Sequence, residues 1–437
     1  MITPNVTEST DELQITALPH ASAREGKLGP FHLSAHQRVA VQRAPLTIFV
    51  GPQGSGKSLL MQLIFLGQAF PYLAAQFVDR EEEIEPRLLL KSLLDRLRRG
   101  EVRDKRRGFN SLVKQGAHIV YQRRTPWRDY GGMSFRVYQT QNMPHLDKHF
   151  SEWVHHLTQS VGWREKWLRP VPSVFIPAER TFYSRFLNGA PDVLQSPTLP
   201  LTMRSFTRTL NLAMETFMGW SNGTPTTEKA RWVAKRARQA LGGEAYIPPR
   251  GPRVVKWRLA DGTIHDLEMA SSGQMEAWPL ILTAMCLLEW QQDGTVANDV
   301  SLYVEEPEVH LHPQAQLEIL HILAYLVNEG IHVTLTTHSP MLLFLLNALL
   351  RSSHLSAQTE NALRQKFGEQ LLLPPLASRL KSEQVAVYAV TPAGVSNLMT
   401  DGEIDEDYLR EAEWTIYKYF NSIQAVLEAT PDALSTH

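Results

Sequence analysis

Gly51-Pro-Gln-Gly-Ser-Gly-Lys57-Ser58 follows the apolar run Leu46–Val50 and precedes a second apolar run at residues 59–66. This order predicts a buried strand, a glycine-rich loop and a helix, which is the context of a P-loop. Glycines allow backbone N–H groups to curve around phosphate oxygens, and the N-terminus of the following helix adds a favourable dipole. We therefore expect a nucleotide site formed by Gly51, Pro52, Gln53, Gly54, Ser55, Gly56, Lys57 and Ser58.

Two carboxylates close a second apolar strand, in Val304-Glu305-Glu306-Pro307-Glu308. Nucleotide hydrolysis needs a phosphate cradle, Mg²⁺ and a base that orients water. Lys57 is expected to contact the β- and γ-phosphates, and the Ser58 hydroxyl to hold Mg²⁺. Because successive side chains of a strand point to opposite faces, we assign Glu305 to the Mg²⁺ shell and Glu306 to the base. The alternative, an acidic strand end that faces solvent, is disfavoured by the P-loop upstream.

A histidine closes the next apolar strand, which the sequence predicts over residues 331–337. His338 lies in Thr336-Thr-His-Ser-Pro340, where we expect it to donate to the γ-phosphate as a second catalytic residue. A lone histidine is more often structural. Its position after the strand that follows the acidic strand favours the catalytic role.

A second candidate anion site opens the helix predicted over residues 272–290. Hydroxyl and N–H groups at a helix N-terminus bind anions, although a Ser-Ser helix cap is commonplace. The P-loop already supplies one phosphate cradle, so a second cradle is explained if it closes over the nucleotide of a partner copy. The residues of this segment are Ser271, Ser272, Gly273 and Gln274.

The remaining pattern predicts an α/β fold. From residue 271 onward, helical and strand patterns alternate, which favours a mainly parallel sheet covered on both faces. Hairpins are predicted over 117–139 and 253–268, and the Pro- and Thr-rich stretch 187–226 is interpreted as an inserted helical arm or lid. Together these patterns indicate a parallel core sheet with an antiparallel β subdomain and a helical insertion.

Composition leaves the choice of partner open. The chain has 437 residues, of which 43% are apolar and 20% are charged, and its formal net charge is −1. A neutral total excludes no nucleic-acid partner, because only the local distribution of charge matters. One cysteine, Cys286, fits a reducing, cytoplasmic setting, and the apolar runs 278–290 and 340–350 are too short to span a membrane. We therefore expect no membrane partner.

In order and spacing, the segments 51–58, 271–274, 305–313 and 337–340 resemble the Walker A, signature, Walker B/D-loop and switch-histidine motifs of ABC-type ATPases. Glu-Glu-Pro-Glu followed by Leu-His-Pro, together with Phe175-Ile-Pro-Ala-Glu-Arg180, is similar to the OLD and RecF-like branch. That branch includes the ATPase subunits of antiphage systems such as Septu and PARIS. The resemblance covers most of residues 28–400. It departs at Gln53, where many relatives have Asn.

The resemblance implies an ABC-type P-loop NTPase with ATP and Mg²⁺ as its ligands. It also implies a head-to-tail homodimer or higher homo-oligomer, with ATP between the Walker A motif of one subunit and the signature of the other. A Q-loop glutamine would contact Mg²⁺; Gln122, Gln139 and Gln141 qualify, and we favour Gln139. Arg180 either serves the site or pairs with an acid. Because no Asn-Lys-x-Asp guanine signature is found, we expect ATP rather than GTP.

Three functions follow from this resemblance. The first is an ATPase that acts as sensor and scaffold of an antiphage defence complex, with a nucleic acid or phage protein as trigger and a separate effector. The second is a RecF-like repair or maintenance ATPase that clamps DNA. The sequence has basic clusters at 96–107, 123–128 and 229–238, which could bind a nucleic-acid backbone. They are equally well explained as solvated helix faces. The third, a module that does not hydrolyse ATP, is disfavoured by Glu306. No Toprim-like acidic set is found after His338, so we expect the nuclease in a separate protein.

We divide the chain into three parts on these patterns. Residues 1–26 are predicted to be a flexible N-terminus, 27–400 the ATPase head and 401–437 an acidic helical tail. The head is expected to carry inserted segments at about 79–112 and 181–245.

Overall fold

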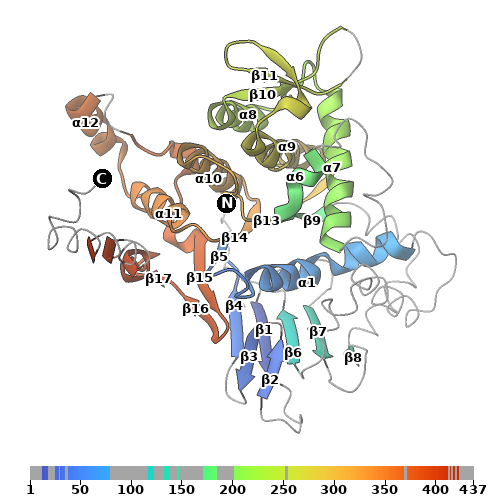
Figure 1. Ribbon diagram of the computed structural model, residues 1–437, viewed down its shortest axis with the longest axis vertical. Coiled ribbons are helices and arrows are strands. Elements are labelled where there is room, and N and C mark those ends of the chain that lie inside the picture. The colour runs from blue at the N-terminus through green and yellow to red at the C-terminus, as the bar shows by residue number, and fades with distance from the viewer. Residues whose placement is uncertain are drawn as a thin grey trace, which may run out of the picture.

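The structure is a computed structural model of the chain, and Figure 1 shows its helices and strands. Three predicted features lie outside the residues that it describes: the insertion at 79–112, the basic clusters at 96–107 and 123–128, and the candidate Q-loop residues Gln139 and Gln141. The described residues are 12–17, 25–28, 30–34, 38–78, 117–122, 132–137, 145–146, 171–184, 201–250, 254–368, 372–411, 414, 417–418 and 421–422.

A six-stranded sheet forms the centre of the molecule, in the order β16-β15-β5-β14-β13-β9. The neighbouring pairs from β15 to β9 are parallel, and β15 pairs with β16 antiparallel. All residues of β5 are buried, as expected of a central strand that is covered on both faces. The mainly parallel sheet confirms the predicted α/β class. The strands are β5 (Leu46–Val50), β9 (Val171–Ile176), β13 (Val296–Glu305), β14 (His332–Thr337), β15 (Val385–Thr391) and β16 (Gly394–Asn397).

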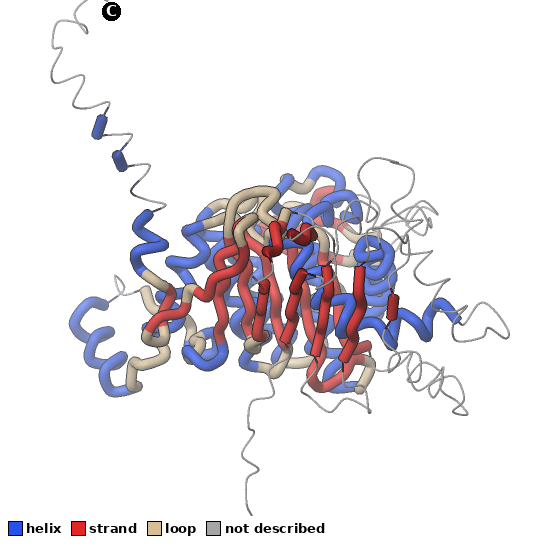
Figure 2. The backbone as a smooth tube through the Cα atoms, turned by 90° about the horizontal axis from the view of Figure 1, so that it is seen from below, coloured by secondary structure: helices blue, strands red, loops and turns tan. Residues whose placement is uncertain are grey.

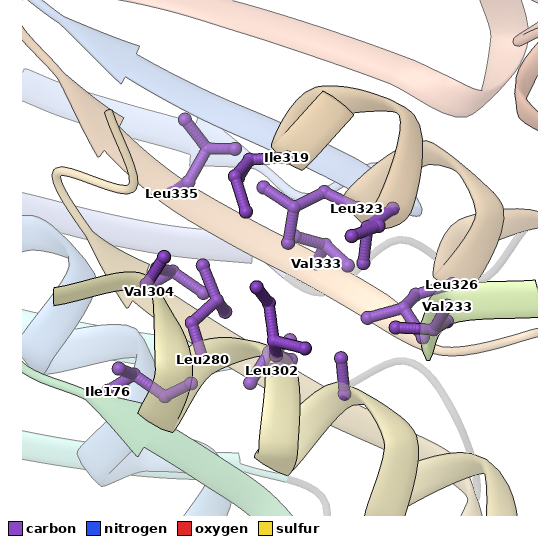
Figure 3. Close-up of a cluster of buried hydrophobic side chains, with 14 of the residues drawn as sticks. Ile176, Val233, Leu280, Leu302, Val304, Ile319, Leu323, Leu326, Val333 and Leu335 are labelled. Atoms are coloured by element: carbon purple, nitrogen blue, oxygen red, sulfur yellow. The ribbon is translucent and has the colours of Figure 1, made fainter. Parts of the chain in front are cut away.

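Helices cover the two faces of this sheet. α1 (Lys57–Val78) packs on β9, β13 and β14 from below in Figure 1, whereas α9 (Ser272–Asp293) and α10 (Pro313–Asn328) lie above. Figure 3 shows the core between β13, β14, α9 and α10, where apolar side chains of strands and helices meet. α11 (Pro340–Ser352) packs beside α10, and Ser339 caps its first turn as the Ser-Pro pair predicts.

A second, antiparallel sheet lies below α1, in the order β4-β1-β6-β7-β8. Its β6–β7 pair is the hairpin predicted at 117–139. The Tyr388 hydroxyl donates to the Gln42 carbonyl oxygen at 2.8 Å, which ties this sheet to β15 of the core. Seen from below, strands run side by side across the middle of the molecule (Figure 2). The strands are β1 (Glu12–Ala17), β4 (Arg38–Gln42), β6 (Ala117–Gln122), β7 (Gly132–Val137) and β8 (His145–Leu146), with β2 (Glu25–Leu28) and β3 (Phe31–Ser34) as a separate hairpin.

The N-terminal prediction needs a correction. Residues 1–26 were expected to be flexible, but β1 pairs with both β4 and β6 and contributes to the sheet interior. Leu13 and Ile15 are fully buried, because their alternating positions place both on the covered face. β1 has only six residues and alternating apolar side chains, which is too short a pattern to identify a strand within a polar segment.

The stretch interpreted as a lid is also different in the structure. α7 (Leu201–Gly219) buries Phe206, Ala213 and Phe217 and packs against α9 and β9. It is therefore part of a helical layer, together with α6 (Thr181–Ser184) and α8 (Glu228–Leu241). A three-stranded antiparallel sheet completes this layer and contains the hairpin predicted at 253–268. Its strands are β10 (Gly243–Tyr246), β11 (Lys256–Leu259) and β12 (Ile264–Asp266).

The boundary predicted at residue 401 falls within folded structure. β17 (Met399–Thr400) pairs with β18 (Glu403–Ile404), and the Asn347 side chain of α11 bonds both backbone groups of Ile404. α12 (Ala357–Phe367) buries none of its residues. Within the described ranges, no helix is both long and apolar enough to cross a bilayer. The remaining short helices are η1 (Ala178–Arg180), η3 (Leu267–Met269), η5 (Leu376–Ser378) and η6 (Ser382–Gln384).

Candidate functional site

The register of the central sheet brings the predicted site residues to one edge. Val50 pairs with Thr337, Thr336 pairs with Glu305, and Val304 pairs with Ile176. The carboxyl ends of β5, β14, β13 and β9 therefore coincide, and the chain leaves each strand at the same edge. In parallel α/β sheets this edge is where ligands bind.

The loop between β5 and α1 depends on its glycines. Gly51, Gly54 and Gly56 have φ values of 151°, 76° and 106°, which other residues rarely adopt. A Cβ atom at Gly56 would lie 2.6 Å from the Phe31 ring, and one at Gly51 would overlap the Val390 carbonyl oxygen. Glycine is therefore required at Gly51 and Gly56 both by the backbone conformation and by packing against Val390 and Phe31. A loop of successive glycines with positive φ can direct its N–H groups toward a phosphate.

Lys57 is 4% exposed and points back into this loop. Its Nζ donates to the carbonyl oxygens of Gly51 and Pro52 at 2.9 and 2.8 Å, and it lies 3.4 Å from His338 Nδ1. Burial lowers the pKa of the Lys57 ammonium, and the carboxylates of Glu306 and Glu308 oppose that shift. The ammonium is therefore a buried positive charge at the strand edge.

His338 links Lys57 to the candidate base. An ammonium can only donate, so Nδ1 of His338 accepts from Lys57, and we assign the ring proton to Nε2. Nε2 lies 2.9 Å from Glu306 Oε1 and donates to it. Glu306 has left the strand, with a φ of 44°, and its N–H donates to the Thr336 carbonyl oxygen at 3.1 Å. The turn directs the Glu306 carboxylate toward the histidine.

Glu305 stays in β13 and faces α1. Its carboxylate accepts from the Ala178 N–H at 3.1 Å, the Gln62 side chain at 3.4 Å and the Ser58 hydroxyl. Burial raises the pKa of Glu305, and these three donors oppose the shift. The two carboxylates of the pair therefore have different partners, as the assignment of separate roles requires.

The donor set fits Mg²⁺. Mg²⁺ is usually held by one or two carboxylates together with substrate phosphates and water, rather than by a cage of protein ligands. Ser58 and Glu305 supply a hydroxyl and a buried carboxylate that are hydrogen-bonded to each other. Among the described residues, no group of three or more His, Cys, Asp and Glu side chains is arranged as a metal site.

Glu308 anchors the segment that carries His338. Its Oε1 accepts from the Thr337 hydroxyl at 2.5 Å and from the His338 N–H at 3.0 Å. The side chain is 8% exposed, so these bonds are shielded from water. Glu308 thus fixes the backbone of the histidine while His338 holds the base.

Removing this anchor has an expected cost. A Glu308→Ala variant leaves two buried donors unpaired, which costs about 1–3 kcal/mol per group in the free energy of unfolding. We expect a lower melting temperature and a slower ATP turnover, because His338 is no longer held. Glu308→Gln is the matched control, since its amide oxygen still accepts from both donors. Equal losses in the two variants would show that the acceptor is not what matters.

Ser271–Gln274 forms the N-terminus of α9. The Ser271 hydroxyl accepts from the Gln274 N–H at 3.3 Å, and the Gln274 Oε1 accepts from the Ser271 N–H at 2.8 Å. Gln274 also donates to the Leu241 carbonyl oxygen, so its side chain is committed to structure. Ser271 and Ser272 are exposed. No hydrogen bond or ion pair among the described residues joins this segment to the 51–58 loop of the same chain.

Sequence reasoning missed three contributors to this region. Gln62 lies one helical turn after Ser58, and that spacing on one helix face was an available signal. Glu308 belongs to the acidic segment 304–308, but the sequence assigns it no role. Glu276, which contacts Arg180, carried no signal because its partner lies 96 residues away.

One comparison with known proteins supports an ATPase. A family model described as an AAA ATPase domain matches residues 211–343, a segment that includes Glu305, Glu306 and His338 and supports an ATPase. A search of curated proteins found no match.

Similar solved structures share low sequence identity with this chain. One is the SmcHead bound to the C-winged helix domain of ScpA, at 12% identity and a TM-score of 0.43, covering 90% of this chain and 98% of that chain. Another is the SMC head domain from Thermotoga maritima, at 10% identity and a TM-score of 0.36, covering 90% and 100%. A third is the ADP conformation of an ATP-binding cassette of an ABC transporter, at 12% identity and a TM-score of 0.32, covering 90% and 92%.

Proposed function

We propose that this chain binds and hydrolyses ATP with Mg²⁺ as an ABC-type ATPase. The observation that carries the proposal is the strand register, which places Lys57, Glu306 and His338 within one hydrogen-bonded chain. A buried ammonium in a glycine loop, a paired carboxylate and hydroxyl, and a second carboxylate held by a histidine are the parts that phosphoryl transfer to water uses.

Each residue has one role in this proposal. Lys57 binds the terminal phosphates. Its ammonium then replaces its hydrogen bonds to the Gly51 and Pro52 carbonyl oxygens with bonds to phosphate oxygens. Ser58 and Glu305 hold Mg²⁺, which neutralises charge on the β- and γ-phosphates when bound. Glu306 accepts a proton from the attacking water. At the same time the water oxygen bonds the γ-phosphorus, and the bond between that phosphorus and the ADP oxygen breaks. From the sequence, His338 was expected to donate to the γ-phosphate; because its Nε2 is bonded to Glu306, its proposed role is instead to align the Glu306 carboxylate.

The test is release of phosphate by the purified protein. We expect turnover of ATP that requires Mg²⁺ and stops in the presence of a chelator. The expected preference for ATP is checked by GTP at the same concentration. No release of phosphate from either nucleotide, or GTP turnover well above ATP turnover, would contradict the proposal.

The proposal includes a second copy of the chain. Ser271 and Ser272 are exposed at the start of α9, and no hydrogen bond among the described residues joins them to the 51–58 loop of their own chain. A head-to-tail dimer would place this anion-binding helix terminus over the nucleotide of the partner. Turnover would then need two copies, with ATP between them.

We further propose that the ATPase is the sensor and scaffold of an antiphage defence complex and controls a separate effector, a nuclease. The support is the likeness of residues 175–180 and 305–313 to OLD and RecF-like ATPases. The RecF-like alternative needs a basic surface for DNA. On the basic helix α8, Lys229, Arg236 and Arg238 are paired with Glu329, Glu318 and Glu244. These pairings reduce the positive charge that α8 offers to a phosphate backbone, whereas the basic clusters at 96–107 and 123–128 lie outside the described residues.

Purification of the tagged chain from its native operon separates the two functions. Recovery of a second polypeptide with the chain is the expected result for a defence complex. Recovery of the ATPase without a second polypeptide, together with strong and salt-sensitive DNA binding, would favour the repair function.

A further inference from the structure

Arg180 contacts the backbone of the turn that carries Glu305 and Glu306. It ends η1, directly after β9, and its side chain is fully buried. Nη1 donates to the Glu305 carbonyl oxygen at 2.6 Å, and Nη2 donates to the Glu306 carbonyl oxygen at 2.8 Å. One guanidinium thus holds the backbone of both carboxylates that were assigned to the site.

The same guanidinium also contacts α9, the helix that begins with the 271–274 segment. Its Nε donates to the Glu276 carbonyl oxygen at 3.0 Å, and Nη2 lies 3.6 Å from the Glu276 carboxylate. Glu276 is four residues after Ser272, so both belong to the first turns of α9 on one helix face. Arg180 therefore joins the strand end that carries the base to the helix that carries Ser272.

These contacts account for the whole side chain. A guanidinium has five N–H donors, and four of those of Arg180 are hydrogen-bonded once the Pro177 carbonyl oxygen at 3.4 Å is included, while the Glu276 carboxylate forms an ion pair beside the remaining one. Burial lowers the pKa of Arg180, and Glu276 is the first of four carboxylates that oppose this shift. A lysine would keep the charge but not the planar arrangement of donors.

The geometry at Glu306 shows what the contacts stabilise. Its φ of 44° lies in the left-handed region, which residues other than glycine rarely adopt. Such conformations persist only where surrounding contacts determine them. The Glu306 N–H is bonded to Thr336, and the Glu306 carbonyl oxygen is bonded to Arg180, so both backbone groups of the turn are held.

We propose that Arg180 is a positioning residue that keeps the Glu306 turn aligned and couples that alignment to the seating of α9. This inference rests on the proposed ATP hydrolysis. A movement of α9, as in closure of two copies around ATP, would act on the base through Glu276 and Arg180. The pair would thereby make hydrolysis depend on the engagement of the signature helix.

The test compares Arg180→Lys in two backgrounds. In the wild-type background we expect the single-turnover rate of ATP hydrolysis to fall by about 10²-fold, as for a misplaced catalytic group. The dissociation constant of a fluorescent ATP analogue should stay unchanged, because the 51–58 loop is not touched. In a Glu306→Gln background the same substitution should cause no further loss, since residues that act as a unit are not additive.

Two further variants serve as a control and as an independent test. Arg43→Lys is the matched control, because Arg43 is also buried and bonds Ser301 on the same strand, away from the turn. We expect it to leave the rate unchanged. Glu276→Gln keeps the backbone acceptor of Arg180 and removes only the charge. Glu276→Gln should lower the rate of hydrolysis less than Arg180→Lys does. In the Glu306→Gln background it should cause no further decrease. If Arg180→Lys does not fold, Glu276→Gln takes its place in the test.

The outcomes distinguish this inference from the function it rests on. An inactive wild-type protein would contradict the proposed ATPase. An active wild type whose rate is unchanged by Arg180→Lys, or reduced equally in both backgrounds, would overturn the positioning role alone. Loss of nucleotide affinity in Arg180→Lys would also overturn it.

Discussion

A Glu306→Gln variant is expected to lose ATP turnover by about 10²–10⁴-fold while it still binds ATP. The glutamine has nearly the same shape and can keep the contact with His338 Nε2 through its amide oxygen. It cannot accept a proton from water. The expected reading is a slow steady-state rate together with ATP, rather than ADP, recovered from protein after gel filtration.

The control for this substitution is Glu318→Gln. Glu318 pairs with Arg236 on α10 and α8, away from the strand edge, so its replacement should leave turnover unchanged. A Glu306→Gln variant that hydrolyses ATP at the wild-type rate would remove Glu306 from the chemistry. A variant that no longer binds ATP would show a role in binding instead.

A Ser272→Arg variant is expected to lose turnover to background while one isolated copy still binds ATP. Ser272 is the first residue of α9 and is exposed, so a large side chain there extends from the start of the helix and does not enter the interior. The capping box belongs to Ser271 and Gln274 and is preserved. Because the segment is proposed to close over a partner's nucleotide, the bulky side chain should block closure. The rate and the nucleotide dissociation constant measure the two effects separately.

Ser272 is a better position for this test than Gly273. A Cβ atom at Gly273 would lie 2.9 Å from the His310 carbonyl oxygen, so any side chain there would disturb the same chain. Ala357→Arg is the matched control, since Ala357 is also an exposed first residue of a serine-capped helix. Wild-type turnover in Ser272→Arg, or equal loss in Ala357→Arg, would contradict the role of α9.

The strands and the P-loop could be predicted because their signals are local. Each strand of the site is a short apolar run, and the intervening helices begin with recognisable caps such as Ser339-Pro340. The shared edge also follows from the sequence, once alternating helices and strands are taken to form a parallel sheet. The order β5-β14-β13, in which β14 lies between the other two, emerged only from the structure.

The side-chain network could not be predicted because its partners are far apart in sequence. Arg180 and the Glu305 carbonyl oxygen are 125 residues apart, and Glu308 and Thr337 are 29 residues apart. Such contacts depend on sheet register and on helix packing, for which a single sequence contains no direct signal. The sequence left two roles open for Arg180, and the structure combines them: it pairs with Glu276 and also holds the site backbone.

The central claim is that one chain supplies only half of each reaction site, and mixing two inactive variants tests it most directly. Lys57→Ala removes the phosphate contact, and Ser272→Arg removes the partner's helix terminus. In a head-to-tail pair of these variants, one site combines an intact 51–58 loop with an intact 271–274 segment. Lys57→Ala mixed with Glu306→Gln is the control, because both changes fall on the same half of the site and leave no intact combination.

The account predicts that each variant alone is inactive, that Lys57→Ala with Ser272→Arg regains ATP turnover, and that the control mixture does not. The claim is contradicted if the first mixture is as inactive as its components, or if Ser272→Arg alone is fully active. Either result would mean that the reaction site is not shared between two chains.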